Sequence, residues 1–255
     1  SLESVGLNEG QRIALVYAVG TISSGAGGID ILGGEVIGSD TLVEAIRDAR
    51  TDESVRAIVL RVDSPGGSAV ASDAIWREVV LAKEDKPVIV SMSGLGASGG
   101  YYIGMAADTI VAQPATLTGS IGVVAGKIAT GGTYKKAGIT FELIEEGRFA
   151  GIYSPLVPFS EEERTKMQQH IEAVYERFLT KAADGRGITR DAVHEVAQGR
   201  VWTGRQARER GLVDELGGLG RAVKMAKARI GIDADTEVEL VVYPRPRSLF
   251  ELLNE

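Results

Sequence analysis

Ser98 lies in a run of small residues, Ser93-Gly94-Leu95-Gly96-Ala97-Ser98-Gly99-Gly100, that follows an apolar segment. Gly96-x-Ser98-x-Gly100 fits a nucleophile elbow, in which a serine hydroxyl projects from a sharp turn between a strand and a helix. Gly94-x-Gly96-x-x-Gly99 fits a dinucleotide-binding turn, in which backbone amides approach a pyrophosphate. The same turn therefore offers two chemistries, nucleophilic catalysis and phosphate binding.

The dinucleotide interpretation requires a carboxylate about twenty residues later, at the end of the next strand, to hold a ribose hydroxyl. That strand is predicted at residues 109–112, and residues 113–118 contain no carboxylate. Asp108 precedes the strand instead of ending it. The sequence thus favours Ser98 as a nucleophile.

A serine nucleophile needs a general base, and the chain contains two histidines, His170 and His194. His170 lies beside the apolar stripe of a long predicted helix, and His194 lies in a charged helical segment. Asp184 would complete a Ser–Asp–His order, but that arrangement places its histidine in a late loop. We interpret both histidines as structural.

Pro65-Gly66-Gly67 forms a second Gly-rich turn between a predicted strand and a helix. Backbone amides of such a turn can stabilise a developing oxyanion, and Gly99 would supply a further amide next to Ser98. A plain strand-to-helix turn would use the same glycines. The two turns, one βα unit apart, favour an active site more strongly than either does alone.

The elements that position these turns alternate between strands and helices. Apolar runs predict strands at residues 13–19, 57–62, 87–92, 109–112 and 141–145, and helices are expected at about 68–83 and 101–107. Ser160 with Glu163 predicts a capping box for a long helix, and Thr203 with Gln206 predicts another. This order is typical of an α/β fold with a parallel sheet covered on both faces.

Composition narrows the class of protein. The chain has 255 residues, 44% of them apolar and 25% charged, with a net charge of −7 and no cysteine. The charge argues against a nucleic-acid partner, because no surplus of Lys or Arg builds a basic face. No apolar run reaches about eighteen residues, and no signal-peptide pattern opens the chain. The start without Met is compatible with an excised fragment, and we expect an anchor or a domain upstream.

Several motifs, in order along residues 10–230, resemble those of the signal peptide peptidase A family. The motifs are Ser64-Pro-Gly-Gly67, Gly96-Ala-Ser-Gly-Gly-Tyr-Tyr102, Ala107-Asp108, Leu117-Thr-Gly-Ser-Ile-Gly-Val123, Ser154-Pro155, Gly199-Arg-Val-Trp-Thr-Gly204, Ala207 and Gly211-Leu-Val-Asp214. The resemblance implies an α/β fold of the Clp protease/crotonase type: a superhelix of repeated β-β-α units with a C-terminal helical section for assembly. It implies one peptidase domain over 1–255, with the core at 10–158, the helical section at 159–230 and a strand and tail at 231–255.

Carried over residue by residue, the resemblance assigns a role to each site position. Ser98 is the nucleophile, Gly67 and Gly99 donate to the oxyanion, and Ser120 orients a catalytic lysine. Gly66 shapes the turn. The predicted substrate-binding residues are Gly66, Ser93, Gly94, Leu95 and Gly96, together with the loop 20–34.

The family's base is a desolvated lysine, and the matching position here is Ala150. The available lysines include Lys127, Lys135 and Lys136. Lys127 is nearest the Thr-Gly-Ser turn and is the candidate substitute base, although it matches no motif lysine. Three explanations stay open: a double-length member whose first half carries the lysine, an engineered Lys-to-Ala change, or a natural pseudo-enzyme. We favour the first, with this chain as the serine-bearing C-terminal half.

The resemblance implies a serine endopeptidase of the Ser/Lys type that degrades remnant signal peptides and other hydrophobic peptides. It further implies a homo-oligomer at the outer face of the cytoplasmic membrane, a lysine-bearing domain or subunit as partner, and neither metal nor cofactor. The alternatives are a crotonase-like acyl-CoA enzyme that uses the same oxyanion hole and a catalytically inactive scaffold.

Overall fold

A computed structural model describes residues 11–29 and 34–244. Its described residues form two compact units, one of residues 11–122 with 178–244 and the other of residues 123–177. The first unit contains a ten-stranded sheet whose main path runs β2-β3-β1-β4-β5-β6-β9. Among the described residues, no helix is both long and apolar enough to cross a bilayer.

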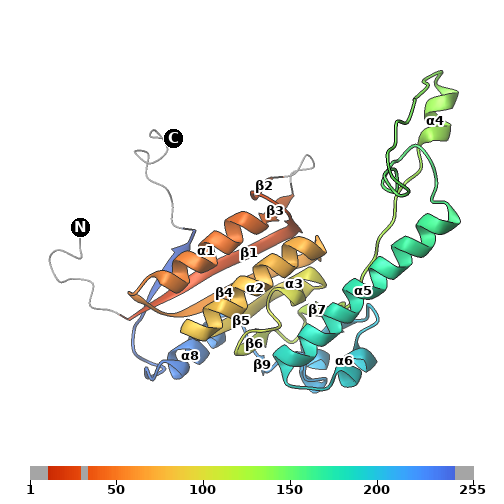
Figure 1. Ribbon diagram of the computed structural model, residues 1–255. Coiled ribbons are helices and arrows are strands. Elements are labelled where there is room, and N and C mark those ends of the chain that lie inside the picture. The colour runs from red at the N-terminus through yellow and green to blue at the C-terminus, as the bar shows by residue number, and fades with distance from the viewer. Residues whose placement is uncertain (1–10, 30–33, 245–255) are drawn as a thin grey trace, which may run out of the picture. The chain divides into compact units, whose positions relative to one another are not determined.

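The centre of the sheet is parallel (Figure 1). Its strands are β1 (Arg12–Ser23), β4 (Val55–Gly67), β5 (Val88–Ala97), β6 (Thr109–Ala112) and β9 (Glu215–Leu216). The remaining strands are β2 (Gly28–Ile29), β3 (Glu35–Gly38), β7 (Leu117–Gly119), β8 (Val201–Thr203) and β10 (Glu239–Tyr243). The strands β3 and β10 pair in parallel with β1, β7 pairs in parallel with β5, and the pairs β2–β3 and β7–β8 are antiparallel. The predicted α/β class with a mostly parallel sheet is confirmed.

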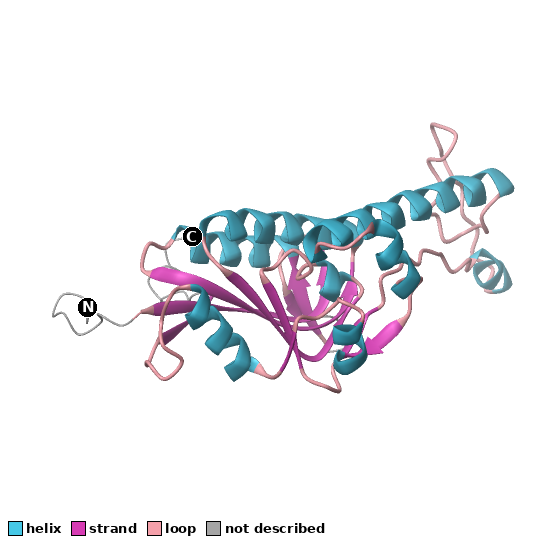
Figure 2. Cartoon of the chain, turned by 90° about the horizontal axis from the view of Figure 1, so that it is seen from below, coloured by secondary structure: helices cyan, strands magenta, loops and turns pink. Residues whose placement is uncertain are grey.

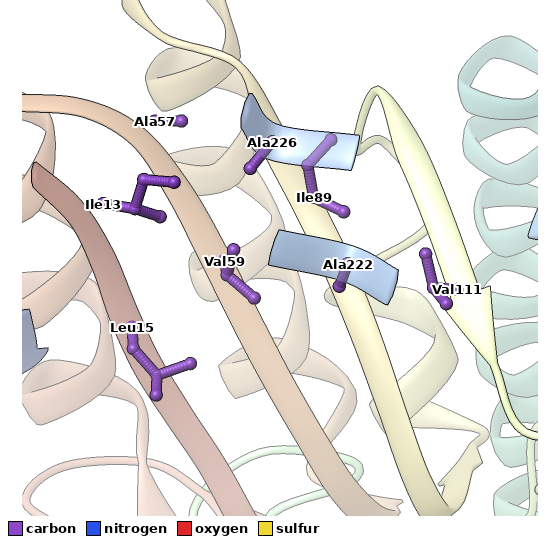
Figure 3. Close-up of a cluster of buried hydrophobic side chains, with 8 residues drawn as sticks. All are labelled: Ile13, Leu15, Ala57, Val59, Ile89, Val111, Ala222 and Ala226. Carbon is purple, nitrogen blue, oxygen red and sulfur yellow. The ribbon is translucent and has the colours of Figure 1, made fainter. Parts of the chain in front are cut away.

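Helices cover both faces of this sheet (Figure 2). The long helices of the first unit are α1 (Ser39–Thr51), α2 (Ala69–Asp85) and α8 (Leu219–Arg229), and the shorter ones are α3 (Gly99–Tyr102), α6 (Arg190–Val196) and α7 (Gly204–Glu209). On the α8 face, alternate residues of adjacent strands and two alanines of α8 form one apolar cluster (Figure 3): Ile13, Leu15, Ala57, Val59, Ile89, Val111, Ala222 and Ala226. The intervening strand residues point to the opposite face, so both faces are buried and the strands read as continuous apolar runs.

The second unit differs from the first in how few hydrophobic side chains its described residues bury. It contains α4 (Gly131–Lys136) and residues 161–177 of α5 (Glu161–Arg186), whose last turns belong to the first unit. Among its described residues, Met167 is the only buried hydrophobic side chain. Large apolar side chains are instead exposed: Val124, Ile128, Ile139, Phe141, Leu143, Ile144, Tyr153 and Val157.

The predicted capping boxes are confirmed, whereas one predicted strand is wrong and one predicted helix is too long. Both capping boxes are present, with the Ser160 amide donating to Glu163 at 2.7 Å and Thr203 paired reciprocally with Gln206. The strand predicted at residues 141–145 is wrong: this exposed segment forms no strand, and the Phe141 ring packs edge-on against Tyr134, 4.9 Å between centroids. The helix predicted at residues 101–107 is only the single turn of α3, because irregular turns follow Tyr102.

Candidate active site

Ser98 occupies a strained turn between β5 and α3. Its φ of 52° and ψ of −119° lie in a region that non-glycine residues rarely adopt. The surrounding backbone holds it there: the Ser98 amide donates to the Gly119 carbonyl at 2.9 Å, and the Ser98 carbonyl accepts from the amides of Tyr101 and Tyr102 at 3.0 and 2.9 Å. Strain of this kind persists where the structure over-determines it, often at functional sites. The conformation is the one that a nucleophile elbow requires, and Ser98 is partly exposed.

The Pro65-Gly66-Gly67 turn lies directly against Ser98. A Cβ atom on Gly66, whose φ is 98°, would lie 2.5 Å from the Gly99 nitrogen and 2.9 Å from the Ser98 Cβ. A Cβ on Gly99 would lie 3.1 Å from the Gly67 nitrogen. The two turns are thus in backbone contact, and only glycine fits at positions 66 and 99. The structure brings together Gly66, Gly67, Ser98 and Gly99; the roles of Gly67 and Gly99 as oxyanion donors stay predictions.

Sheet register explains why these turns meet. β4 and β5 are neighbouring parallel strands, and Ser64 pairs with Gly96. Ligands of open α/β sheets bind where chains leave the carboxyl ends of such strands. The Pro-Gly-Gly segment also continues β4, since Gly66 and Gly67 pair with Thr21 and Ile22 of β1. The predicted end of this strand near residue 62 was therefore too early.

Ser64 is a site residue that sequence reasoning missed. It is fully buried, and its hydroxyl donates to the Gly20 carbonyl at 2.6 Å and accepts from the Gly66 amide at 3.1 Å. One hydroxyl thereby fixes the turn that lies against Ser98. A serine directly before Pro-Gly-Gly at a strand end was the available signal.

Replacing Ser64 by Ala is expected to lower the free energy of unfolding by about 1 to 3 kcal/mol, because the buried Gly66 amide and the half-buried Gly20 carbonyl lose their partner. Ser72→Ala is the matched control. Ser72 is equally buried, but its hydroxyl only donates, to a Ser68 carbonyl that also accepts the Ser72 amide. Urea unfolding of both variants checks the difference, and equal losses would contradict the bracing role of Ser64.

Ser120 lies beside the Ser98 turn. Ala97 of β5 pairs with Gly119 of β7. Ser98 directly follows the first of these residues, and Ser120 directly follows the second. Ser120 has a φ of 48°, and its amide donates to the Arg200 carbonyl at 2.7 Å. The structure places Ser120 directly after the β7 residue that pairs with β5, and its role toward a lysine stays a prediction.

The predicted substrate-binding stretch is the last part of β5. The Ser93 hydroxyl accepts from Arg61 at 2.8 Å, and the Leu95 amide donates to Asp63 at 3.1 Å. Gly94 is exposed. Gly96 packs against Met92, whose sulfur would lie 2.7 Å from an added Cβ.

The predicted loop 20–34 is partly strand, since residues 20–23 belong to β1 and residues 28–29 form β2, while residues 30–33 lie outside the described residues. A mainly apolar pocket of about 400 Å³ adjoins this segment. Its lining includes Tyr17, Val19, Ile29, Val36, Leu42 and Pro244.

Ala150 lies in an exposed turn of the second unit, where its amide donates to the Gly147 carbonyl at 3.2 Å. Lys135 and Lys136 are exposed in the last turn of α4. The Lys127 amine lies over the Phe159 ring, 4.4 Å from its centroid, and makes no hydrogen bond within the described part of the chain.

The lysines of the first unit are committed elsewhere or exposed. Lys83 donates to the Ala106 carbonyl, Lys86 to those of Ala49 and Asp52, and Lys227 to those of Ala234 and Thr236. Burial lowers the pKa of Lys86 more than the nearby Asp52 raises it. Lys181 pairs with Asp73, and Lys224 is exposed.

The candidate triad partners lie in helices. His194 is on α6, with a ring nitrogen 3.4 Å from the Gln198 amide nitrogen. His170 is exposed on the part of α5 that belongs to the second unit, and Asp184 is exposed on α5 in the first. Within the described ranges, no group of three or more His, Cys, Asp or Glu side chains is arranged to hold a metal ion.

Comparison with known proteins fits this geometry. Residues 81–233, which include Ser98, Ser120 and Ala150, match the family described as peptidase family S49. This match covers more than half of the chain. The chain belongs to peptidase family S49. Membership in S49 places it among the peptidases, and therefore among the hydrolases.

Named relatives agree with the S49 assignment. The chain is 44% identical over 257 residues to "Serine protease SPPA, chloroplastic" of Arabidopsis thaliana, covering 98% of this chain and 37% of the relative. It is 44% identical over 218 residues to "Protease 4" of Salmonella typhi, covering 85% and 34%. It is 39% identical over 233 residues to "Protease 4" of Haemophilus influenzae, covering 91% and 37%. The resemblance to the signal peptide peptidase A family is confirmed, and the chain spans about a third of the length of each of these relatives.

Proposed function

We propose that this chain is the serine-bearing half of a Ser/Lys endopeptidase that cleaves hydrophobic peptides, including remnant signal peptides. The observation that carries the proposal is the strained Ser98 turn in backbone contact with Gly66, next to the amides of Gly67 and Gly99. Such a turn presents a hydroxyl at the start of a helix, where negative charge is stabilised. The apolar pocket beside β1 and β2 supports an apolar substrate.

In this mechanism the Ser98 Oγ attacks the peptide carbonyl carbon and transfers its proton to a neutral lysine amine. The amides of Gly67 and Gly99 donate to the resulting oxyanion. The C–N bond then breaks, the lysine returns the proton to the leaving amine, and an acyl ester remains on Ser98. A water molecule, deprotonated by the same lysine, hydrolyses that ester and regenerates the serine.

We propose that the lysine comes from outside this chain, from a homologous domain or a neighbouring subunit, and is oriented by Ser120. Ala150 supplies no proton acceptor, and the lysines of the first unit are paired or exposed. The exposed apolar side chains of the second unit, with Met167 alone buried among its described residues, support a partner that covers them. A homo-oligomer that includes the lysine-bearing domain provides this cover.

The proposal also covers the fold type of the peptidase domain and the location of the assembly. The parallel sheet with helices on both faces supports a Clp protease/crotonase-like superhelix in which the two units work as one peptidase domain. We place the assembly at the outer face of the cytoplasmic membrane, held by a segment other than those described. No metal or cofactor takes part in the proposed steps.

Ser98→Ala tests the proposal. In the assembly that contains the lysine, hydrolysis of a fluorogenic hydrophobic peptide should fall at least about 1,000-fold, because the nucleophile is removed. Ser54→Ala, an exposed serine that bonds to Asp52, is the control and should leave the rate unchanged. A fluorophosphonate adduct mapped to Ser98 would support the assignment. Retention of the wild-type rate by Ser98→Ala would overturn it.

A further inference from the structure

Three polar side chains, each from a different helix, form a row of hydrogen-bonded or ion-paired groups: Tyr102 of α3, Asp73 of α2 and Lys181 of α5. Tyr102 lies one helical turn beyond Ser98. The Tyr102 hydroxyl donates to Asp73 Oδ1 at 2.5 Å, and Lys181 forms an ion pair with the same oxygen. Tyr102 is 5% exposed, the Lys181 side chain is 18% exposed and the Asp73 side chain is 41% exposed. Hydrogen bonds in which one partner is charged are stronger than those between neutral groups.

This row connects the two turns of the candidate site. Tyr102 is the last residue of α3, and its amide donates to the Ser98 carbonyl at 2.9 Å. Asp73 is on α2, which begins at Ala69 after the Ser68 cap and the Gly67 turn. The hydrogen bond between Tyr102 and Asp73 therefore joins the helix that follows the nucleophile to the helix that follows the Pro-Gly-Gly turn.

Aromatic contacts fix the third member. The Lys181 amine lies 3.5 Å from the centroid of the Trp76 ring, a cation–π geometry that restricts where it can sit. The Tyr102 ring packs against Phe178 at 4.6 Å and meets the edge of Trp76 at 6.4 Å. Lys181 thus balances the charge of Asp73 from a fixed position and keeps that carboxylate available as an acceptor.

A helix as short as α3, with four residues, has few hydrogen bonds of its own and takes its orientation from its contacts. We propose that Tyr102, Asp73 and Lys181 form a positioning network, which holds α3 so that Ser98 keeps its attacking geometry against Gly66. None of the three touches the reacting atoms. The inference rests on the proposed function, because its main consequence is read in peptide hydrolysis.

Tyr102→Phe removes one hydroxyl and tests the network. In the lysine-containing assembly, kcat should fall about 10-fold while KM changes less than about 2-fold, because alignment is lost but substrate contacts remain. Tyr243→Phe is the matched control: the buried Tyr243 hydroxyl also donates to an aspartate, Asp52 Oδ2, at 2.7 Å, but from β10. Its kcat should equal that of the wild type.

Lys181 provides a second comparison. Lys181→Met should lower kcat as Tyr102→Phe does, whereas Lys181→Arg keeps the charge and the contact with Trp76 and should restore most of the rate. A similar rate for the Met and Arg variants would overturn the role of the charge. Equal kcat values for Tyr102→Phe and Tyr243→Phe would overturn the network as a whole.

Hydrogen exchange gives a readout that does not depend on peptide hydrolysis. In the chain alone, Tyr102→Phe should speed exchange of the Tyr101 and Tyr102 amides, which bond to Ser98, and Tyr243→Phe should not. If Ser98→Ala leaves hydrolysis unchanged, the proposed function fails, and this exchange measurement still decides whether the network holds the turn. Unchanged exchange in Tyr102→Phe would overturn the inference.

Discussion

Alone, the chain is expected to hydrolyse a hydrophobic peptide at least about 100-fold more slowly than it does with a lysine-bearing homologous domain. A positioned general base typically contributes about 100-fold to 10,000-fold to a rate, and Ala150 leaves that position without one. The chain alone keeps only the contribution of its turn and backbone amides. Initial rates measured across a titration with the added domain check this expectation.

The control for this titration is the same domain with its lysine replaced by Ala, which should restore nothing. Ala150→Lys in the isolated chain distinguishes the explanations of the missing base. Recovery of activity in that variant would show that the base belongs at residue 150 of this chain. A fully active wild-type chain would contradict a base supplied from outside.

Gly66→Ala is expected to lower kcat/KM by about 100-fold or more. An added methyl would lie 2.5 Å from the Gly99 nitrogen and 3.0 Å from the Ala97 carbonyl oxygen, so the backbone on one side must move. A displacement of about 1 Å at reacting groups is enough for a loss of this size. Steady-state kinetics in the lysine-containing assembly, together with urea unfolding, measure the effect.

Gly231→Ala is the matched control for this substitution. Gly231 has a φ of 72°, in the same left-handed region as the 98° of Gly66, but nothing lies within 4 Å of an added Cβ. Both variants therefore carry left-handed strain of about 1 to 2 kcal/mol, and only Gly66→Ala adds the clash with the Ser98 turn. If the two lose the same activity, contact between the turns is irrelevant to catalysis.

The paired turns were predictable because local sequence encodes them. Ser98 sits in a Gly-flanked strand-to-helix turn, and parallel strands bring their carboxyl ends to one edge, so Gly66 and Ser98 had to meet. Strand β6 begins and ends at the predicted residues, 109 and 112, since its apolar run is short and sharply bounded.

Other features of the fold and of the site could not be predicted, because they depend on contacts between residues far apart in the sequence. The apolar residues at 141–145 read as a strand, yet they are exposed, and burial rather than composition decides whether such a run pairs. The row formed by Asp73, Tyr102 and Lys181 joins residues up to 108 positions apart. The bracing hydroxyl of Ser64 is likewise visible only once Gly20 lies beside it.

The left-handed conformation at Ser98 carries an evolutionary consequence. Glycine would adopt the same dihedral angles without penalty, so the residue of lowest conformational energy at this position is one that has no hydroxyl. Selection for robustness alone would therefore push the position toward glycine and an inert protein. A serine occupies the position nevertheless, and the glycines around it leave room for its side chain. The turn is therefore a place where function is maintained at a cost in folding stability.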